Sequence, residues 1–388
     1  MTKLDKIKFL FLKFRGLTEI GVANIVTAGI SALFWLYIAR LLGTENYGIV
    51  SYLIAISALT TVLSFIGAGT TLQVYTAKEV KLQPALYFIT LVIATISSIA
   101  LFFIVHNIGV SLFVLGNVIF GLVIADLLGR KQYKKFSIYL ITQKILTVVF
   151  ALALFHIINY NGIILGFALS FFPYAVSMYR IFKGAKIDFS LLKSRFGFIV
   201  NSYIMDLGRQ FSSSLDKLIV APMLGFALLG NYQLGVQILT VLCLLPSIVY
   251  QYTLSHDASG DSNKKLKQLV ILGSVILTIL GITLAPIIIP VLFPKFTEAV
   301  IVIQIMSLST IPITINNTYI SKFLGTEKIK IVLIGSGIFL AIQISMIILL
   351  GKIFGINGVA ASFVLATTSE SSYLIIIAHY FKKKNIKN

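Results

Sequence analysis

The chain has little cysteine, histidine or charge, and each shortage excludes a class of protein. A single Cys243 among 388 residues permits no intrachain disulfide framework and no cysteine-clustered metal site. The four histidines lie far apart, near the ends of apolar runs, so we expect no metal centre. Charged residues make up 12% of the chain, about half the share typical of soluble domains. A soluble globular domain is therefore excluded.

Catalytic motifs are also missing. The segment GAGTT at 67–71 lacks the lysine of a phosphate-binding loop. No Ser–His–Asp set and no carboxylate pair at hydrolase spacing is visible, and the connections between apolar runs are too short for a large soluble catalytic loop. We therefore expect no enzyme and no cofactor. A membrane-bound polymerase or acyltransferase and a non-transporting scaffold are the lesser alternatives.

Long hydrophobic runs dominate the sequence. Hydrophobic residues make up 58% of the chain, and the mean hydropathy is +0.97. Runs of about 20 apolar residues, each long enough to cross a hydrocarbon core about 30 Å thick, follow one another. No cleavage site clearly follows the first run, so we expect it to stay in the mature protein. We predict an all-α integral membrane protein with about 12 transmembrane helices, at 18–40, 47–68, 84–105, 109–128, 138–158, 162–181, 197–220, 231–252, 268–292, 298–321, 330–351 and 357–380.

The net charge of +19 could suggest nucleic acid, but its distribution indicates membrane topology instead. With these spans, 26 of the 32 basic residues fall on the two termini and on the connections of one side. Three lie on the opposite side, and Lys144, Arg209 and Lys217 lie within spans. Because cytoplasmic loops carry the excess of lysine and arginine, we predict that both termini are cytoplasmic. Orientation and contact with anionic membrane lipids explain the basic loops, so no nucleic acid partner is expected.

The sequence repeats itself. The segment LLGRKQYKKFSIYL, after the fourth predicted span, resembles FLGTEKIKIVLIGS after the tenth, and identities recur at an offset of 196, including Asn161/Asn357 and Gly162/Gly358. Earlier in each half, Asn46-Tyr47 aligns with Asn231-Tyr232 at an offset of 185. Each half has six spans, so both halves enter the membrane in the same orientation. We predict two lobes, 1–190 and 191–388, arranged as a parallel repeat that binds substrate between them and works by alternating access.

Three segments carry a family resemblance. ARLLGTENYGIVSYLIA (39–55), DKLIVAPMLGFALLGNYQLG (216–235) and FGINGVAASF (354–363) resemble, in order and spacing, motifs of the O-antigen (Wzx-type) flippases. These polysaccharide exporters belong to the multidrug/oligosaccharidyl-lipid/polysaccharide exporter superfamily. The resemblance covers about residues 16–380.

The resemblance implies a V-shaped bundle of two six-helix lobes in the bacterial plasma membrane. It implies a flippase that moves an undecaprenyl-diphosphate-linked oligosaccharide, such as an O-antigen (lipopolysaccharide) or capsule repeat unit, to the outer leaflet. A polysaccharide polymerase and a chain-length regulator are the partners it suggests. Twelve spans argue against the related lipid II flippases, which usually have more. A cation-coupled multidrug antiporter of the same fold is the main alternative.

One predicted span is unusually polar. The segment 201–220 contains Asp206, Arg209, Asp216 and Lys217, and each charge at the bilayer centre costs about 2.5–3.5 kcal/mol on insertion scales. Helical spacing places these residues with Gln210 and Ser213 on one stripe, opposite an apolar face. We therefore expect the stripe to face a watery cavity.

The polar stripe supplies most of the candidate site residues. Arg209 is a candidate for gripping a diphosphate with two parallel hydrogen bonds, although an intrahelical pair with Asp206 is an open alternative. Further substrate-binding candidates are Gln210, Asn201, Lys217, Lys144 and Asn24. Asp216 and Lys217 are as readily structural residues near the outer boundary, and Lys144 can equally snorkel toward the cytoplasm.

Glu370 lies in the middle of the last span, within ATTSESSYL. A carboxylate inside the membrane can bind a proton or Na⁺ and relay it during transport. Glu370, Asp206 and Asp216 are therefore candidates for ion coupling, with H⁺ or Na⁺ as the ion. A hydrogen-bonded lock between helices is an equally good explanation of Glu370. Near the cytoplasmic end of the fourth span, Asp126 is expected to pair with Arg130.

Overall fold

A computed structural model describes residues 15–182, 187–258, 264–326 and 328–387. Over these residues the chain forms α-helices and one short 3₁₀ helix, with no strand. It divides into two compact units, one of Met1–Phe34 with Tyr52–Ser214 and the other of Trp35–Ser51 with Leu215–Asn388. Several of the N-terminal lysines used in the topology prediction lie outside the described residues.

The first unit is built around α5, most of whose residues are buried. The helix packs against α3, α4, α6, α7 and α8, and α6 packs closely on α7. Long apolar stretches explain these helices, because in lipid a backbone satisfies its hydrogen bonds only within a helix or a closed barrel. The helices that contribute to this unit are α2 (Arg15–Phe65), α3 (Ala68–Ala77), α4 (Gln83–Val105), α5 (Ile108–Gly129), α6 (Tyr133–Ile158), α7 (Tyr160–Leu169), η1 (Phe172–Tyr174), α8 (Ala175–Phe182), α9 (Ser190–Lys193) and α10 (Phe196–Leu224).

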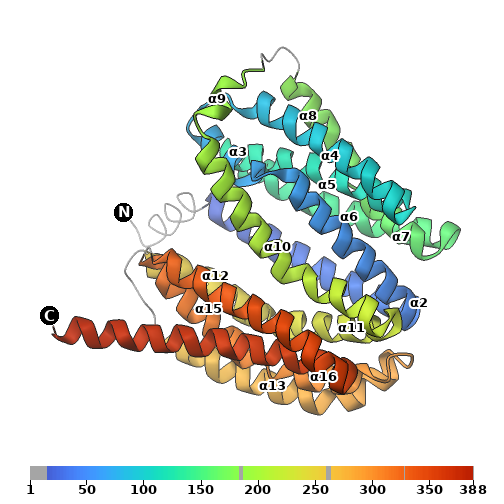
Figure 1. The fold of residues 1–388 in the computed structure, drawn as a ribbon, viewed down its shortest axis with the longest axis vertical. Coiled ribbons are helices and arrows are strands. Elements are labelled where there is room, and N and C mark those ends of the chain that lie inside the picture. Colours follow the sequence, from blue (N-terminus) through green and yellow to red (C-terminus); the bar gives the residue numbers. More distant parts are fainter. Residues whose placement is uncertain (1–14, 183–186, 259–263, 327, 388) are drawn as a thin grey trace, which may run out of the picture. The chain divides into compact units, whose positions relative to one another are not determined.

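The second unit contains the end of α10 and all later helices. In it α15 packs against α12, α13 and α16, and α14 packs against α11, α13 and α16. Figure 1 shows α12, α13, α15 and α16 lying side by side. Its remaining helices are α11 (Phe226–Leu242), α12 (Leu244–Ala258), α13 (Lys264–Leu292), α14 (Ala299–Ser307), α15 (Thr310–Gly325) and α16 (Ile329–Lys387).

The borders of the compact units fall inside α2 and α10. The compact units therefore have other boundaries than the two predicted six-helix lobes, 1–190 and 191–388. The predicted lobes are defined by their movement during transport, and the division into these lobes stays a prediction.

Eight helical stretches of the described residues are long and apolar enough to cross a membrane, and two of them, Tyr160–Tyr179 and Ala299–Gly325, join shorter elements. The number is nine if α11 and α12, which are bent by 49° at their junction, form one span. The apolar part of α2 alone runs for 47 residues, about 70 Å of helix against a hydrocarbon core of about 30 Å. Gly43 interrupts α2 and Gly355 interrupts α16 with non-helical backbone angles. Each of these two helices therefore covers two predicted spans. All twelve predicted segments are mainly helical, while the number of crossings and the side of the termini stay predictions.

The predicted repeat is visible in the turn between the last two spans of each half. Asn159 (φ 53°, ψ −141°) and Gly355 (φ 58°, ψ −138°) have nearly the same backbone conformation. Three residues later, Gly162 and Gly358 approach the carbonyl oxygens of Leu154 and Leu350, where a β-carbon would lie 2.1 and 2.0 Å away. Since all three pairs are separated by 196 positions, the two halves form this turn in the same way.

The earlier part of the repeat needs a correction. Gly43 (φ 73°, ψ −178°) and Gly225 (φ 90°, ψ 165°) share one conformation. Gly48 packs on the carbonyl oxygen of Phe226, and Gly230 packs on that of Thr44, each at 1.9 Å from the position of a β-carbon. This reciprocal contact matches Gly43 with Gly225 and Gly48 with Gly230, both 182 positions apart. The predicted offset of 185 was wrong because it aligned the Asn-Tyr pairs, whereas the close backbone approach is made by the glycines.

Candidate functional site

The polar stripe of α10 lines a cavity in the first unit. Arg209 and Gln210 follow Asp206 by three and four residues, and Ser213 follows them by four and three, so a helix presents all four on one face. Side chains from α2, α3 and α5 complete the wall, and the cavity volume is about 550 Å³. The remaining lining residues are Ala58, Thr61, Val62, Phe65, Gly69, Thr70, Gln73, Asn117, Gly121, Ile124, Ala125 and Leu128.

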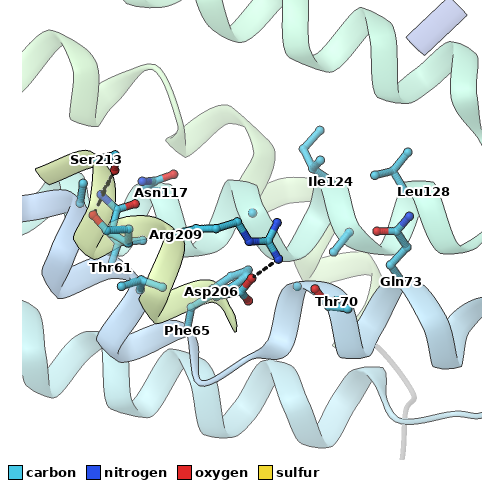
Figure 2. A pocket seen from close by; sticks show the side chains of 16 residues that line it. Thr61, Phe65, Thr70, Gln73, Asn117, Ile124, Leu128, Asp206, Arg209 and Ser213 are labelled. Atoms are coloured by element: carbon cyan, nitrogen blue, oxygen red, sulfur yellow. Dashed lines mark hydrogen bonds and ion pairs between the residues drawn. The ribbon is translucent and has the colours of Figure 1, made fainter. Parts of the chain in front are cut away.

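Arg209 is the cation of this cavity. Its Nη2 lies 3.1 Å from Oδ1 of Asp206, and the two side chains are 69% and 20% exposed. Figure 2 shows the guanidinium extending among the lining side chains, with the ion pair at its edge. Arg209 and Asp206 therefore form the intrahelical pair that was the alternative to substrate binding, but the pair uses only one of the guanidinium nitrogens. The remaining donors of Arg209 face the cavity, where a planar oxyanion can accept two hydrogen bonds.

Neutral hydrogen-bonding groups surround the ion pair. Gln210 donates from Nε2 to Oγ of Ser214 at 2.7 Å and to Oγ of Ser213 at 3.3 Å. These bonds hold the amide against α10 while its side chain lines the cavity. Asn117 on α5 and Gln73 on α3 contribute two further amides. One cation, one carboxylate and several amides and hydroxyls suit a ligand with both phosphate and sugar hydroxyl groups.

Two glycines shape the wall of the cavity. A β-carbon on Gly69 would lie 2.7 Å from Cε1 of Phe65, and one on Gly121 would lie 3.0 Å from Cζ of the same ring. The Phe65 ring therefore fits between α3 and α5 only because both positions lack a side chain. The ring adds to the apolar part of the lining, which Val62, Ile124 and Leu128 also form.

Sequence reasoning missed the partners of the stripe. Asn117, Gln73, Thr61 and Thr70 lie on helices that precede α10 by about 80 to 150 positions. The one available signal was Asn117, the single amide in segment 108–125, which is otherwise apolar apart from Ser111. The threonines and Gln73 resemble many others in the chain and carry no such signal.

Besides Lys217, three predicted binding residues do not line this cavity. Asn201 and Asn24 are exposed, and Lys144 is half-buried on α6. Asn201 precedes Asp206 by five residues, which turns it to another face of the helix. A substrate role for these three residues stays a prediction.

Asp216 and Lys217 belong to the second unit, although they continue the stripe in sequence. Asp216 is 5% exposed and accepts a hydrogen bond from the buried Tyr232 hydroxyl at 3.0 Å. It also accepts from the backbone N–H of Lys217 at 2.8 Å and from Nζ at 3.1 Å. The Asp216–Tyr232 hydrogen bond joins α10 to α11. This geometry fits the structural role for Asp216 and Lys217 that the sequence left open.

Glu370 joins two helices of the second unit. The residue is 9% exposed, and its Oε2 accepts a hydrogen bond from Nδ2 of Asn316 on α15 at 3.0 Å. Ser371 donates to Oδ1 of Asn316 at 2.5 Å and to the carbonyl oxygen of Pro312 at 2.9 Å. On the other side, a β-carbon on Gly335 would lie 3.6 Å from Oε1 of Glu370. The carboxylate is therefore held by polar groups on one side and meets a position without a side chain on the other.

The first half has no carboxylate at this place. At an offset of 196, Asn316 and Glu370 correspond to Phe120 and Tyr174. These two aromatic rings pack with their centroids 4.8 Å apart. The repeat therefore fills this position with a ring pair in one half and with an acidic hydrogen-bonded group in the other.

The fold is that of known membrane transporters. It is similar to the lipid II flippase MurJ in an inward closed conformation, with a TM-score of 0.77, 14% identity, and coverage of 93% of this chain and 87% of that one. It is also similar to an inward-facing multidrug resistance MATE family transporter of the MOP superfamily, with a TM-score of 0.72, 11% identity, and coverage of 94% and 96%. A MOP superfamily transporter from Pyrococcus furiosus, described as having a binding pocket of reverse polarity, matches with a TM-score of 0.62, 11% identity and 96% coverage of both chains.

No protein-family model matches the sequence, and no curated protein is similar to it in sequence. At such low identity the structural likeness establishes the fold alone. The chain is thus a multi-pass membrane protein with the helical fold of the MOP-superfamily transporters.

Proposed function

We propose that this protein is a flippase for a lipid-linked oligosaccharide carried on undecaprenyl diphosphate, at the bacterial plasma membrane. The observation that carries the proposal is the cavity in which the Arg209 guanidinium stands among amides and hydroxyls. A diphosphate offers oxygen pairs that match the guanidinium fork. Sugar hydroxyls match Gln73, Asn117 and Gln210, which both donate and accept hydrogen bonds.

Ion coupling is the second part of the proposal. Glu370 is a carboxylate held by Asn316 and buried within a helix pair, which is an arrangement that can take up H⁺ or Na⁺. Asp206 serves instead to orient Arg209, because it is the acceptor of the guanidinium hydrogen bond. Asp216 is already engaged by Lys217 and Tyr232, so we do not assign it to coupling.

A cation-coupled multidrug antiporter is the alternative. The likeness to a multidrug resistance MATE transporter favours it at the level of fold. Arg209 argues against it, because most of the guanidinium is exposed to the cavity and repels a cationic drug. The fold itself is no guide to the choice, since the lipid II flippase MurJ shares it.

The test is export in the native host. Deletion of the gene should trap a lipid-linked oligosaccharide on the cytoplasmic side and remove glycan from the surface. The proposal fails if surface glycan persists and no intermediate accumulates. Increased sensitivity to cationic drugs, with normal surface glycan, would support the antiporter instead.

Complementation with Arg209 variants places the activity in the cavity. Arg209→Ala should insert normally but fail to restore surface glycan, and Arg209→Lys should restore it only in part, because an ammonium group lacks the planar fork. The control is Lys352→Gln, which removes an exposed cation that does not line the cavity. If Arg209→Ala exports as well as the control, Arg209 has no role in substrate binding.

A further inference from the structure

A second cavity lies in the first unit, past the ends of α3 and α5. It is formed by the connection from α3 to α4 and the connection from α5 to α6, and its volume is about 640 Å³. Both connections fall on the side that the charge distribution predicts to be cytoplasmic. The lining residues are Thr76, Ala77, Glu79, Lys81, Gln83, Pro84, Gly129, Arg130, Lys131 and Gln132.

The charge of this cavity is mainly positive. Lys81, Arg130 and Lys131 line it, against a single lining carboxylate, Glu79. Arg130 donates from Nε to Oδ2 of the buried Asp126 at 2.7 Å, which confirms the predicted pair, and its side chain is still 44% exposed. In the part of the chain that the structure describes, Lys81 and Lys131 have no ion-pair partner. The cavity therefore presents two lysines that form no ion pair within the described residues.

The walls of this cavity are well fixed. Gly129 packs on Thr76, where a β-carbon would lie 2.6 Å from the Cβ of Thr76. Gln83 donates from Nε2 to the Thr76 hydroxyl at 3.1 Å, which joins the start of α4 to the end of α3. Glu79 and Lys131 each adopt a left-handed conformation, with φ values of 59° and 58°. Such conformations are uncommon in residues other than glycine and fix the path of each connection.

The second half treats the corresponding place differently. Gly325, the counterpart of Gly129, packs on Asp257. Asp257 is 8% exposed and forms an ion pair with Lys267, which is also 8% exposed, while Ser321 donates a hydrogen bond to the same carboxylate oxygen. The second half therefore neutralises its lysine internally. The first half has the neutral Gln83–Thr76 bond there and leaves its cations facing an open cavity.

We propose that the cavity lined by Lys81, Arg130 and Lys131 binds a phosphate group at the cytoplasmic surface. Three cations around a cavity at the end of a helix pair can take a phosphodiester or phosphate, with the Gln83 and Gln132 amides as further donors. Basic pockets at the cytoplasmic ends of membrane helices bind anionic lipid headgroups. The phosphate comes either from such a headgroup or from a soluble phosphate. The site is separate from the α10 cavity and does not depend on the proposed transport function.

The test compares two double variants of the full chain, purified in an uncharged detergent. Lys81→Gln/Lys131→Gln removes two lining cations, and Lys134→Gln/Lys135→Gln removes two exposed cations in the first turn of α6 that do not line the cavity. Native mass spectrometry measures retention of the anionic phosphatidylglycerol, with phosphatidylcholine as the comparison, because the quaternary ammonium group of phosphatidylcholine balances its phosphate charge. Thermal stabilisation by inorganic phosphate, at constant ionic strength, measures the soluble source. Circular dichroism confirms folding, and the single variant Lys131→Gln replaces the first double variant if that one fails to fold.

The lining variant should bind phosphatidylglycerol about 30-fold more weakly than the wild type, at about 1 kcal/mol for each basic residue. The Lys134/Lys135 variant should bind it nearly as well as the wild type. Phosphate stabilisation lost in the lining variant alone, without selective lipid retention, would assign the site to a soluble phosphate. Equal losses in both double variants, or no loss in either, would overturn the proposal, because binding would then be general surface attraction or absent.

Discussion

The buried ion pair of the second half offers the sharpest test of the structural comparison between the two halves. Lys267 and Asp257 are 10% and 4% exposed at their side chains, so both charges are taken out of water. Replacing Lys267 with Met removes one charge of the pair, while Asp257 still accepts a hydrogen bond from Ser321. Breaking a buried pair in this way costs about 3–5 kcal/mol of folding free energy, because Asp257 stays buried and loses Lys267 as a counter-charge.

The first half provides the matched control. Gln83→Met removes the neutral hydrogen bond to Thr76, which occupies the corresponding place. A neutral hydrogen bond contributes about 0.5–1.5 kcal/mol, so the loss should be several-fold smaller than for Lys267→Met. The double variant Asp257→Leu/Lys267→Met should recover most of the stability, because replacing both charges with apolar groups is often neutral.

The assay is equilibrium unfolding of the full chain in mixed micelles, with increasing sodium dodecyl sulfate and helix content followed by circular dichroism. The expected order of stability is wild type and the double variant first, then Gln83→Met, then Lys267→Met. The reasoning is refuted if Lys267→Met and Gln83→Met cost the same. That result would mean that the Asp257–Lys267 pair is solvated and that the halves do not differ at this place.

Two further predictions concern the second half. Glu370→Gln should fold, because Asn316 can still donate to the new amide carbonyl, and its transport in proteoliposomes should no longer respond to an imposed H⁺ or Na⁺ gradient; an unchanged response would exclude Glu370 from coupling. Gly358→Val should prevent recovery of folded protein, because its β-carbon would lie 2.0 Å from the Leu350 carbonyl oxygen, whereas Gly337→Ala, with nothing within 4 Å, should be tolerated. Equal yields of these two variants in a size-exclusion assay would contradict the close packing at Gly358.

The helices could be predicted because their cause is local. A run of apolar residues must satisfy its own backbone hydrogen bonds in lipid, and the twelve predicted segments are accordingly mainly helical. The helix breaks at Gly43 and Gly355 were harder to predict from the sequence. A glycine in an apolar run signals a break only once its positive φ is known, and many glycines of this chain lie within regular helix.

The cavity could be predicted only in part. Spacing along α10 is enough to place Asp206, Arg209 and Ser213 on one face, because a helix has 3.6 residues per turn. Their meeting with Asn117 and Gln73 depends on how α3 and α5 pack beside α10. That packing is the sum of many small contacts between residues far apart in sequence, and no local pattern encodes it.

The repeat shows the same division. Sequence alone revealed that the chain is a membrane protein of two related halves, because apolar length and matching turns such as Gly162 and Gly358 can be read directly. Only the tertiary structure decided which residues meet: Phe120 packs on Tyr174 in one half, and Asn316 donates to Glu370 in the other. The physical reason is that the sequence gives the chemical type of each side chain. The group that the side chain contacts depends on which helix packs against it, and that contact decides what the side chain can do.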